Sequence, residues 1–176
     1  FSDRYPKIDI ISKLSALSAE LSAASAKYQG ASYFQRCCLG SAGAISAGLG
    51  VATGDRMHFS MADNAYGRLQ RLEIDSAMNR DVILLRCASL NTWASRAGDI
   101  AKADQAIALL HTVDASKDGY GCYVLAFSHL VKARIMVEGN VATVTSGFRM
   151  AAEREAKQAL QLIAAGQSAP NVRAVA

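Results

Sequence analysis

Three histidines are the residues best suited to chemistry in this sequence, and none has a catalytic or metal-binding spacing. His58 lies between Asp55 and Asp63, which suggests acid–base chemistry or a metal ion. A carboxylate-bridged di-iron bundle, however, requires two Glu-x-x-His motifs, and the sequence contains neither. We therefore interpret His58 as a partly exposed histidine near the start of a helix. His111 and His129 lie on or beside apolar stripes and are interpreted as core or interface residues.

A glycine-rich run, GLGVATGD at 48–55, superficially resembles a phosphate-binding loop. It lacks the Gly-Lys-Ser/Thr of the Walker pattern, and no strand is expected before it. No serine stands in the elbow motif of a hydrolase. We therefore expect a protein that is not an enzyme and that has no catalytic residue, cofactor or metal site.

The four cysteines are Cys37, Cys38, Cys87 and Cys122. They form no CxxC pair, and no histidine lies at zinc-finger spacing from any of them. We interpret them as reduced core residues. Because their number is even, an extracellular disulfide framework is the alternative.

The elements that must position these residues are helices. The only prolines are Pro6 and Pro170, so no proline interrupts a helix between them. Alanine, serine and leucine dominate the composition, and 176 residues are the length of one ordinary domain. We expect a single all-α domain over 1–176, built of about seven helices in an irregular, α-solenoid-like stack of antiparallel hairpins.

The segment 8–30 is predicted to be an amphipathic helix that ends at Gly30. Serines occupy the other side of this helix. The narrow stripe is suited either to seal the end of a helical stack or to pair with a partner helix. Its apolar members are Ile11, Leu14, Leu17, Leu21, Ala24 and Tyr28.

The segment 37–54 has no charged residue. Ala42, Ser46, Gly50 and Gly54 recur every four residues, a row of small residues that lets another helix approach closely. Contact with a membrane is one interpretation. We favour a fully buried helix, because the segment has few of the large aliphatic residues that drive membrane insertion.

The remaining helices follow from apolar spacing and capping residues. Ser60 and Asp63 form a weak capping box before the first of them, and Asp99 caps the helix that follows Gly98. The β-branched run at 141–147 is expected to be a loop. The other predicted helices cover 61–74, 81–97, 120–138 and 148–165.

Three helices end in glycine followed by Asp or Asn, at Gly54, Gly98 and Gly139. These turns divide the chain after 8–30 into helix-turn-helix units. Near-regular units of this kind are typical of helical repeats, in which stacking supplies the core. The units cover 31–75, 78–116 and 118–166.

Residues 84–116 resemble the tetratricopeptide and pentatricopeptide repeats through Leu90, the turn Ala97-Gly98-Asp99, Ala103 and Ile107. Residues 153–175 are similar to the end of a pentatricopeptide repeat, with Pro170-Asn171-Val172 as the entry to the next. The resemblance covers about half the chain and implies a scaffold for protein or RNA. The base-reading position corresponds to about Ala88, which offers no side-chain hydrogen bond.

The charge pattern favours protein partners. The net charge of +4 is spread along the chain, and every stretch mixes signs, whereas nucleic-acid binders concentrate Lys and Arg. We expect an interaction subunit of a larger complex, with an RNA-binding module and a membrane-associated protein acting through 37–54 as alternatives. Aromatic residues Trp93, Tyr120, Tyr123 and Phe127 are expected in the core, and any that are exposed are candidate partner contacts, Trp93, Tyr120 and Tyr123 above all.

The chain begins at Phe1 and is basic. This start is expected of a mature chain from which a targeting segment has been removed. We therefore expect an organellar protein, mitochondrial or plastid, with the cytoplasm as the alternative.

Overall fold

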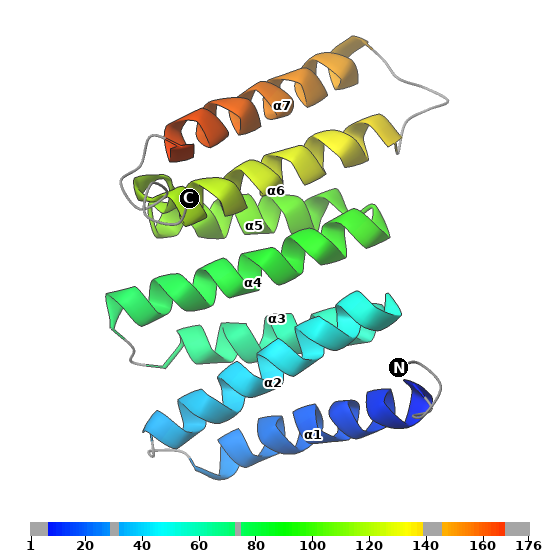
Figure 1. Cartoon of the computed structure of the whole chain (residues 1–176), viewed down its shortest axis with the longest axis vertical. Helices are drawn as coiled ribbons and strands as arrows, with labels where there is room; N and C mark the ends of the chain where they lie inside the picture. Colours follow the sequence, from blue (N-terminus) through cyan, green and yellow to red (C-terminus); the bar gives the residue numbers. More distant parts are fainter. Residues whose placement is uncertain (1–6, 29–31, 73–74, 139–145, 168–176) are drawn as a thin grey trace. The chain divides into compact units, whose positions relative to one another are not determined.

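A computed structural model of the chain describes residues 7–28, 32–72, 75–138 and 146–167 (Figure 1). Within these ranges the chain forms stacked helices and no strand, so the all-α prediction with about seven helices is confirmed. A single turn of 3-10 helix, η1, spans Ala115–Lys117. The α-helices are α1 (Lys7–Lys27), α2 (Ser32–Thr53), α3 (Arg56–Gln70), α4 (Ser76–Ala97), α5 (Ile100–Thr112), α6 (Gly119–Glu138) and α7 (Ser146–Gln167).

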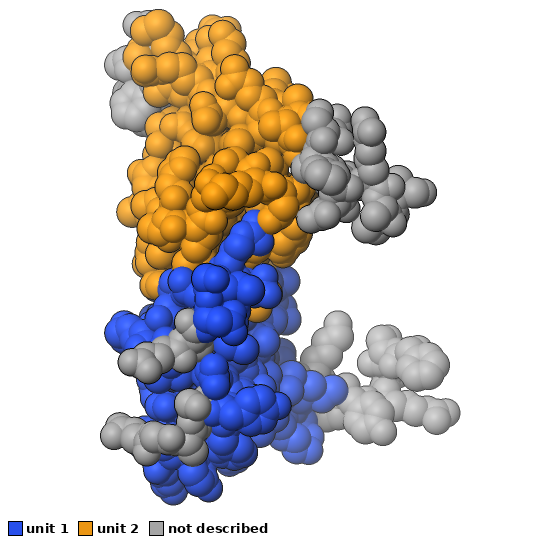
Figure 2. Space-filling view, turned by 90° about the vertical axis from the view of Figure 1, so that its left-hand side faces the viewer, with its two compact units in different colours: residues 1–82 blue, residues 83–176 orange. Residues whose placement is uncertain are grey.

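The chain divides into two compact units (Figure 2). Unit 1 covers residues 1–82 and contains α1, α2 and α3; unit 2 covers residues 83–176 and contains α5, α6 and α7. The boundary falls within α4. The predicted single domain and its three helix-turn-helix units stay predictions.

In unit 1, α1 packs on its serine side rather than on its leucine side. Ser18 is fully buried, and its hydroxyl donates to the carbonyl of Ala42 at 3.1 Å. The guanidinium of Arg68 in α3 donates to the hydroxyls of Ser22 at 3.1 Å and Ser25 at 2.7 Å. Small side chains that form hydrogen bonds let the helices approach closely, and the opposite apolar row remains exposed.

Close approach also governs the contact between α2 and α3. A Cβ atom on Gly43 would lie 2.7 Å from the ring of Tyr66, and one on Gly50 would lie 2.7 Å from the ring of Phe59. Both rings are buried, so they have no room to move aside. Glycine at these two positions is therefore a packing requirement.

The prediction that α2 is fully buried is wrong. One side of the helix, with Ala42 and Ser46, is buried, but the other side exposes Cys37, Ala44 and Gly48. The reason is that α1 and α3, the helices that share the most extensive contacts with α2, cover one arc of its surface. Cys37 thus also departs from the prediction that all four cysteines lie in the core, although all four are free thiols.

In unit 2, the part of α4 from Ile83 onward packs with α5 and α6 around an apolar core. The central members of this core are Leu90 of α4, Leu110 of α5 and Leu125 of α6. On the other side of α6 lies α7, the neighbour with which α6 shares its most extensive contact (Figure 1). Helix α6 therefore has neighbours on two sides, and the remaining arc of its surface is exposed.

Two predicted turns have the expected geometry. Gly54 and Gly98 adopt left-handed backbone conformations with φ of 75° and 65°. Asp99 caps α5 by accepting a hydrogen bond from the amide of Ala101 at 3.1 Å. Gly30, Gly139 and the loop residues 141–145 lie outside the described residues.

Several helix boundaries differ from the predictions. Asp55, not Ser60, caps α3, because its carboxylate accepts from the amide of Met57 at 2.8 Å. The helix α4 begins at Ser76, five residues earlier than predicted, after the carboxylate of Asp75 accepts from the amide of Met78. In α3 the observed cap, Asp55, lies upstream of the predicted one, and in α4 the cap Asp75 was not predicted.

Candidate protein-binding surface

An exposed apolar row follows one side of α6. Its residues recur at helical spacings of three, four and seven, which places their side chains on one face. Tyr120 is 55% exposed and Tyr123 is 62% exposed, although both are large and partly apolar. We call this set the α6 row; its members are Tyr120, Tyr123, Phe127, Leu130 and Val137.

The aromatic part of the α6 row is preorganised. The rings of Tyr123 and Phe127 are stacked, with centroids 6.4 Å apart and an angle of 8° between their planes. Aromatic pairs in this offset arrangement stabilise each other, so both rings are held in place before any partner arrives. Little side-chain entropy would be lost when such rings are covered.

The aliphatic part of the α6 row borders a shallow groove between α6 and α7. The groove has a volume of about 490 Å³. Leu130, Ala133 and Val137 of α6 form one wall, and Ala152 and Ala156 of α7 form the other. Because the α7 side chains are small, the groove has room for the side chains of another helix.

Charged residues line the rims of the groove in pairs. Arg134 and Glu138 of α6 form an ion pair at 2.7 Å, and Arg149 and Glu153 of α7 form one at 3.4 Å. Each pair lies within its own helix and is largely exposed. The groove is therefore apolar in its centre and carries both signs of charge at its edge, as in many protein interfaces.

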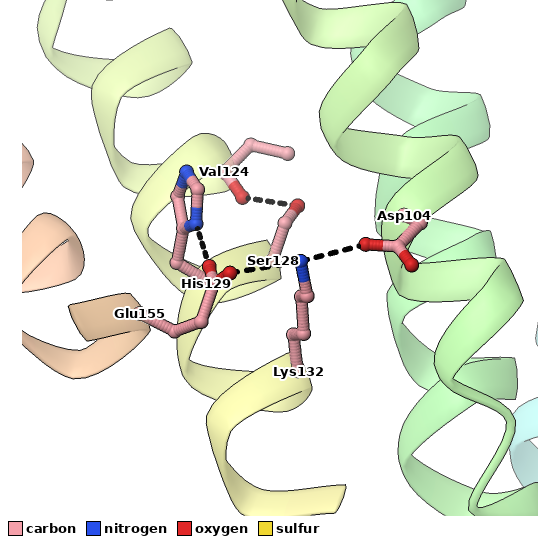
Figure 3. Close-up of polar contacts among 6 residues, drawn as sticks. All are labelled: Asp104, Val124, Ser128, His129, Lys132 and Glu155. Carbon is pink, nitrogen blue, oxygen red and sulfur yellow. Dashed lines mark hydrogen bonds and ion pairs between the residues drawn. The ribbon is translucent and has the colours of Figure 1, made fainter. Parts of the chain in front are cut away.

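A polar network holds α6 against both of its neighbours (Figure 3). The Nζ of Lys132 lies 2.9 Å from Asp104 Oδ1 of α5 and 2.8 Å from Glu155 Oε1 of α7. The other oxygen of Glu155 lies 2.5 Å from Nδ1 of His129. One lysine thus bridges α5 and α7, and one glutamate ties two successive turns of α6 to α7.

The network shifts the pKa values of its charged members. Burial alone would raise the pKa of Glu155, but the hydrogen bonds from Lys132 and His129 outweigh it and hold this pKa below its usual value. Burial alone would lower the pKa of Lys132, but the hydrogen bonds to Glu155 and Asp104 raise it. Both groups are therefore stabilised in their charged forms.

The network does not have the connections of a catalytic triad. The hydroxyl of Ser128 donates to the carbonyl of Val124 at 3.0 Å and accepts from Nδ2 of Asn91 at 2.8 Å, so it is not directed at the imidazole of His129 (Figure 3). The Nε2 atom of His129 is buried and has no hydrogen-bond partner among the described residues. The arrangement is suited to hold helices together.

In the described ranges, no three or more histidine, cysteine or carboxylate side chains lie together in a way that could hold a metal ion. His58 is buried rather than partly exposed, which corrects that prediction. The reason is that α3 begins at Arg56, so His58 lies in its first turn next to the buried Phe59. His111 is exposed and so does not lie in the core, whereas an interface role for it stays a prediction.

The three candidate contact residues do not lie together in the structure. Tyr120 and Tyr123 lie together in the α6 row and are exposed, so the expectation that they belong to the core is wrong. Trp93 of α4 packs against the core of unit 2, with Nζ of Lys102 4.3 Å from the centre of its ring. Of the three, only the two tyrosines lie in the α6 row.

The sequence alone did not indicate the aliphatic part of the α6 row, the groove or the polar network. The spacing of Tyr123, Phe127, Leu130 and Val137 was visible in the sequence, but the segment is strongly apolar and its few polar residues are spread around the helix, so no polar side marked where the exposed face lies. The network joins residues of three helices, and no local pattern relates Lys132 to Glu155.

None of the described helices combines the length and hydropathy needed to cross a membrane. No family model, no curated protein and no solved structure matches this chain. The resemblance to tetratricopeptide and pentatricopeptide repeats therefore stays a prediction.

Proposed function

We propose that this chain is a non-catalytic helical interaction protein that binds a protein partner on the α6 row and the adjoining groove. The observation that carries the proposal is the exposure of Tyr120, Tyr123 and Phe127 in one row. Aromatic residues of this kind are enriched among the residues that dominate binding energy at protein interfaces. Monomeric surfaces rarely expose such rows without a binding function.

The groove specifies what kind of partner segment fits. An amphipathic helix recognises its site by inserting apolar anchors at helical spacing into a hydrophobic groove. The groove between α6 and α7 offers an apolar centre with small alanines along α7, and mixed charges at its rims. We infer that the partner presents an amphipathic helix with a narrow apolar stripe and charges of both signs beside it.

RNA binding has less support at this site. Arg134 and Arg149 are the arginines at the rims of the groove, and each pairs with a glutamate one turn away on its own helix. Phosphate binding requires cations that are not already neutralised by carboxylates. Membership of a larger, organellar complex stays a prediction.

Photo-crosslinking in the source cells tests the proposal. A photoreactive residue in place of Tyr123 is expected to crosslink one protein species that also co-purifies with the chain at fixed stoichiometry. Leu85 on α4, which is 51% exposed, provides the matched control position and should not give the same product.

Substitution then tests the energetic role of the α6 row. The double variant Y123D/F127D should weaken binding of the crosslinked partner by at least about tenfold, because two charges would replace the central aromatic anchors. Leu85→Asp should leave the affinity unchanged. A chain that purifies alone, or equal losses in both variants, would contradict the proposal.

A further inference from the structure

The outer side of α1 carries a second exposed apolar row, on unit 1. Ile10, Leu14, Leu17 and Tyr28 are between 37% and 48% exposed. Their spacing places them on one face of the helix, which we call the α1 row. Helix α1 packs on α2 and α3 through its serines. Tyr28, which follows the last residue of α1, contacts the ring of Phe34 with centroids 4.7 Å apart, whereas Ile10, Leu14 and Leu17 stay at least 37% exposed.

The two flanks of the α1 row differ in chemistry. Four charged residues, all exposed, lie on one flank at helical spacing: Asp9, Lys13, Glu20 and Lys27. The other flank carries Ser18 and Ser22, which contact α2 and α3. The charged side chains of α1 whose exposure the structure describes therefore lie on the side that faces away from the body of unit 1.

The order of these charges is complementary to itself when reversed. Along the helix the signs run minus at Asp9, plus at Lys13, minus at Glu20 and plus at Lys27. When the helix is placed antiparallel to a second copy, each of these charges lies opposite a charge of the other sign. A helix of this kind attracts a second copy of itself in antiparallel orientation, as in coiled-coil pairing.

We propose that α1 pairs with α1 of a second copy of this chain, antiparallel, about a twofold axis near Leu17. The axis places Leu14 against Leu21 of the second copy, which buries the α1 row. Lys13 and Asp9 form an exposed ion pair at 2.7 Å within the helix, and in the dimer Lys13 also lies opposite Glu20 of the second copy and Asp9 opposite Lys27 of the second copy. The two residues of each pair between the copies are offset along the helix axis by at most about two residues, a distance that these long side chains span.

Antiparallel symmetry also decides between the two orientations. In an antiparallel twofold pair, the same flank of each helix meets its counterpart, so the charged flanks face each other. In a parallel pair, the charged flank of one helix would meet the serine flank of the other, where Ser18 and Ser25 carry no charge and are already hydrogen-bonded. The antiparallel pair is therefore the one in which these charges meet partners of opposite sign.

The neighbouring helix leaves room for the second copy. Helix α2 lies beyond the serine flank of α1, and the residues that it exposes in its middle are small, namely Ser41, Ala44 and Gly48. Small side chains let a second helix pair approach closely. The contact would involve one helix of each chain, about 32 Å long at 1.5 Å per residue. Because an interface of one helix pair is small, we expect a weak dimer in concentration-dependent equilibrium with the monomer.

The first test is the mass of the purified chain as a function of concentration. Light scattering should show a rise from the 18.6 kDa of one chain towards twice that mass at sub-millimolar concentration. Leu17→Glu should keep the chain monomeric, because it places a charge at the twofold axis. Leu85→Glu, at an exposed leucine on α4, should dimerise as the wild type does.

A charge exchange tests the orientation. Lys13→Glu alone and Glu20→Lys alone each bring like charges together in the antiparallel pair and should weaken dimerisation several-fold. The double variant K13E/E20K restores opposite signs and should recover most of the wild-type affinity. Circular dichroism of each variant should be unchanged, because these side chains are exposed.

Three results would overturn the proposal. One is a wild-type chain that stays monomeric throughout the concentration range. Another is a double variant that dimerises no better than the single ones, which would exclude the antiparallel register. The third is a dimer that Leu17→Glu leaves intact but Y123D/F127D abolishes, since it would place self-association on the α6 row. All three are measured without a partner protein, so they are independent of the proposed function.

Discussion

Glu155 attaches α7 to the described network through two contacts. It contacts Lys132 and His129 of α6 from α7, and only 18% of its side chain is exposed. Lys132 in turn reaches Asp104 of α5. Removal of this single carboxylate therefore affects how three helices are held together.

Glu155→Gln is expected to lower the free energy of unfolding by about 1–3 kcal/mol, because Lys132 and His129 lose a charged hydrogen-bond partner in a mostly buried place. Urea unfolding near neutral pH measures this loss. Glu153→Gln is the matched control on the same helix: its carboxylate is 57% exposed, and the change should stay within about 0.5 kcal/mol. Equal effects of both substitutions would contradict the role assigned to the network.

The lowered pKa of Glu155 predicts a pH dependence of stability. Because this pKa is lower in the folded chain than in the unfolded chain, the folded state binds fewer protons. The stabilisation is present above the unfolded pKa of about 4.3 and is lost as the pH falls through the folded value. The difference in unfolding free energy between wild type and E155Q should shrink as the pH falls below about 4.3. A difference that stays constant in acid would show that the carboxylate is not stabilised by charge.

The cysteines differ in reactivity at the residue scale. Cys37 is exposed, whereas Cys38, Cys87 and Cys122 are buried, and burial raises the pKa of the Cys122 thiol. Thiolate is the reactive form, so both burial and a raised pKa slow alkylation. In the folded chain, Cys37 should react with maleimide first and the other three only on unfolding. Peptide mass spectrometry checks the order, and early labelling of Cys87 would contradict it.

At the scale of elements, the packing of α2 depends on glycines that leave no room for the methyl group of an alanine. Gly43→Ala and Gly50→Ala should each lower the free energy of unfolding by about 1–3 kcal/mol, because the new Cβ overlaps the buried rings of Tyr66 and Phe59. Gly48→Ala in the same helix meets no atom within 4 Å and should stabilise the chain by about 0.5–1 kcal/mol. Thermal or urea unfolding separates the three, and a stabilised G50A variant would contradict this packing.

Helices α1 and α6 illustrate opposite uses of an apolar stripe. In α1 the leucine stripe is exposed, because serines make the hydrogen bonds that attach the helix to α2 and α3. In α6 both neighbours cover apolar arcs, and the remaining arc still exposes aromatic residues. An apolar stripe alone therefore does not identify the side of a helix that faces the core.

At the scale of the whole molecule, the two exposed rows predict two separable interactions. The α1 row lies on unit 1 and the α6 row on unit 2, so a substitution in one should not affect the other. Leu17→Glu should abolish the dimer and retain partner binding, whereas Y123D/F127D should retain the dimer and lose the partner. Light scattering and a binding assay on the same variants check this, and loss of both interactions in either variant would contradict their independence.

The sequence by itself determined the helical class and the turns at Gly54 and Gly98. With Pro6 and Pro170 as its only prolines, the chain can form uninterrupted helices, and Gly98 with Asp99 specifies both a left-handed turn and the cap of the next helix. These features depend on backbone conformations and hydrogen bonds over a few residues. Local physics is therefore sufficient to predict them.

Only the tertiary structure decided which surfaces are covered. The serines of α1, the tyrosines of α6 and the contact between Lys132 and Glu155 all depend on helices that are distant in sequence. In an Ala- and Ser-rich chain, small residues pack as well as leucines when they form hydrogen bonds, so hydrophobicity does not mark the buried side. Burial is a property of the assembled helices, and for this reason the candidate surfaces emerged only from the structure.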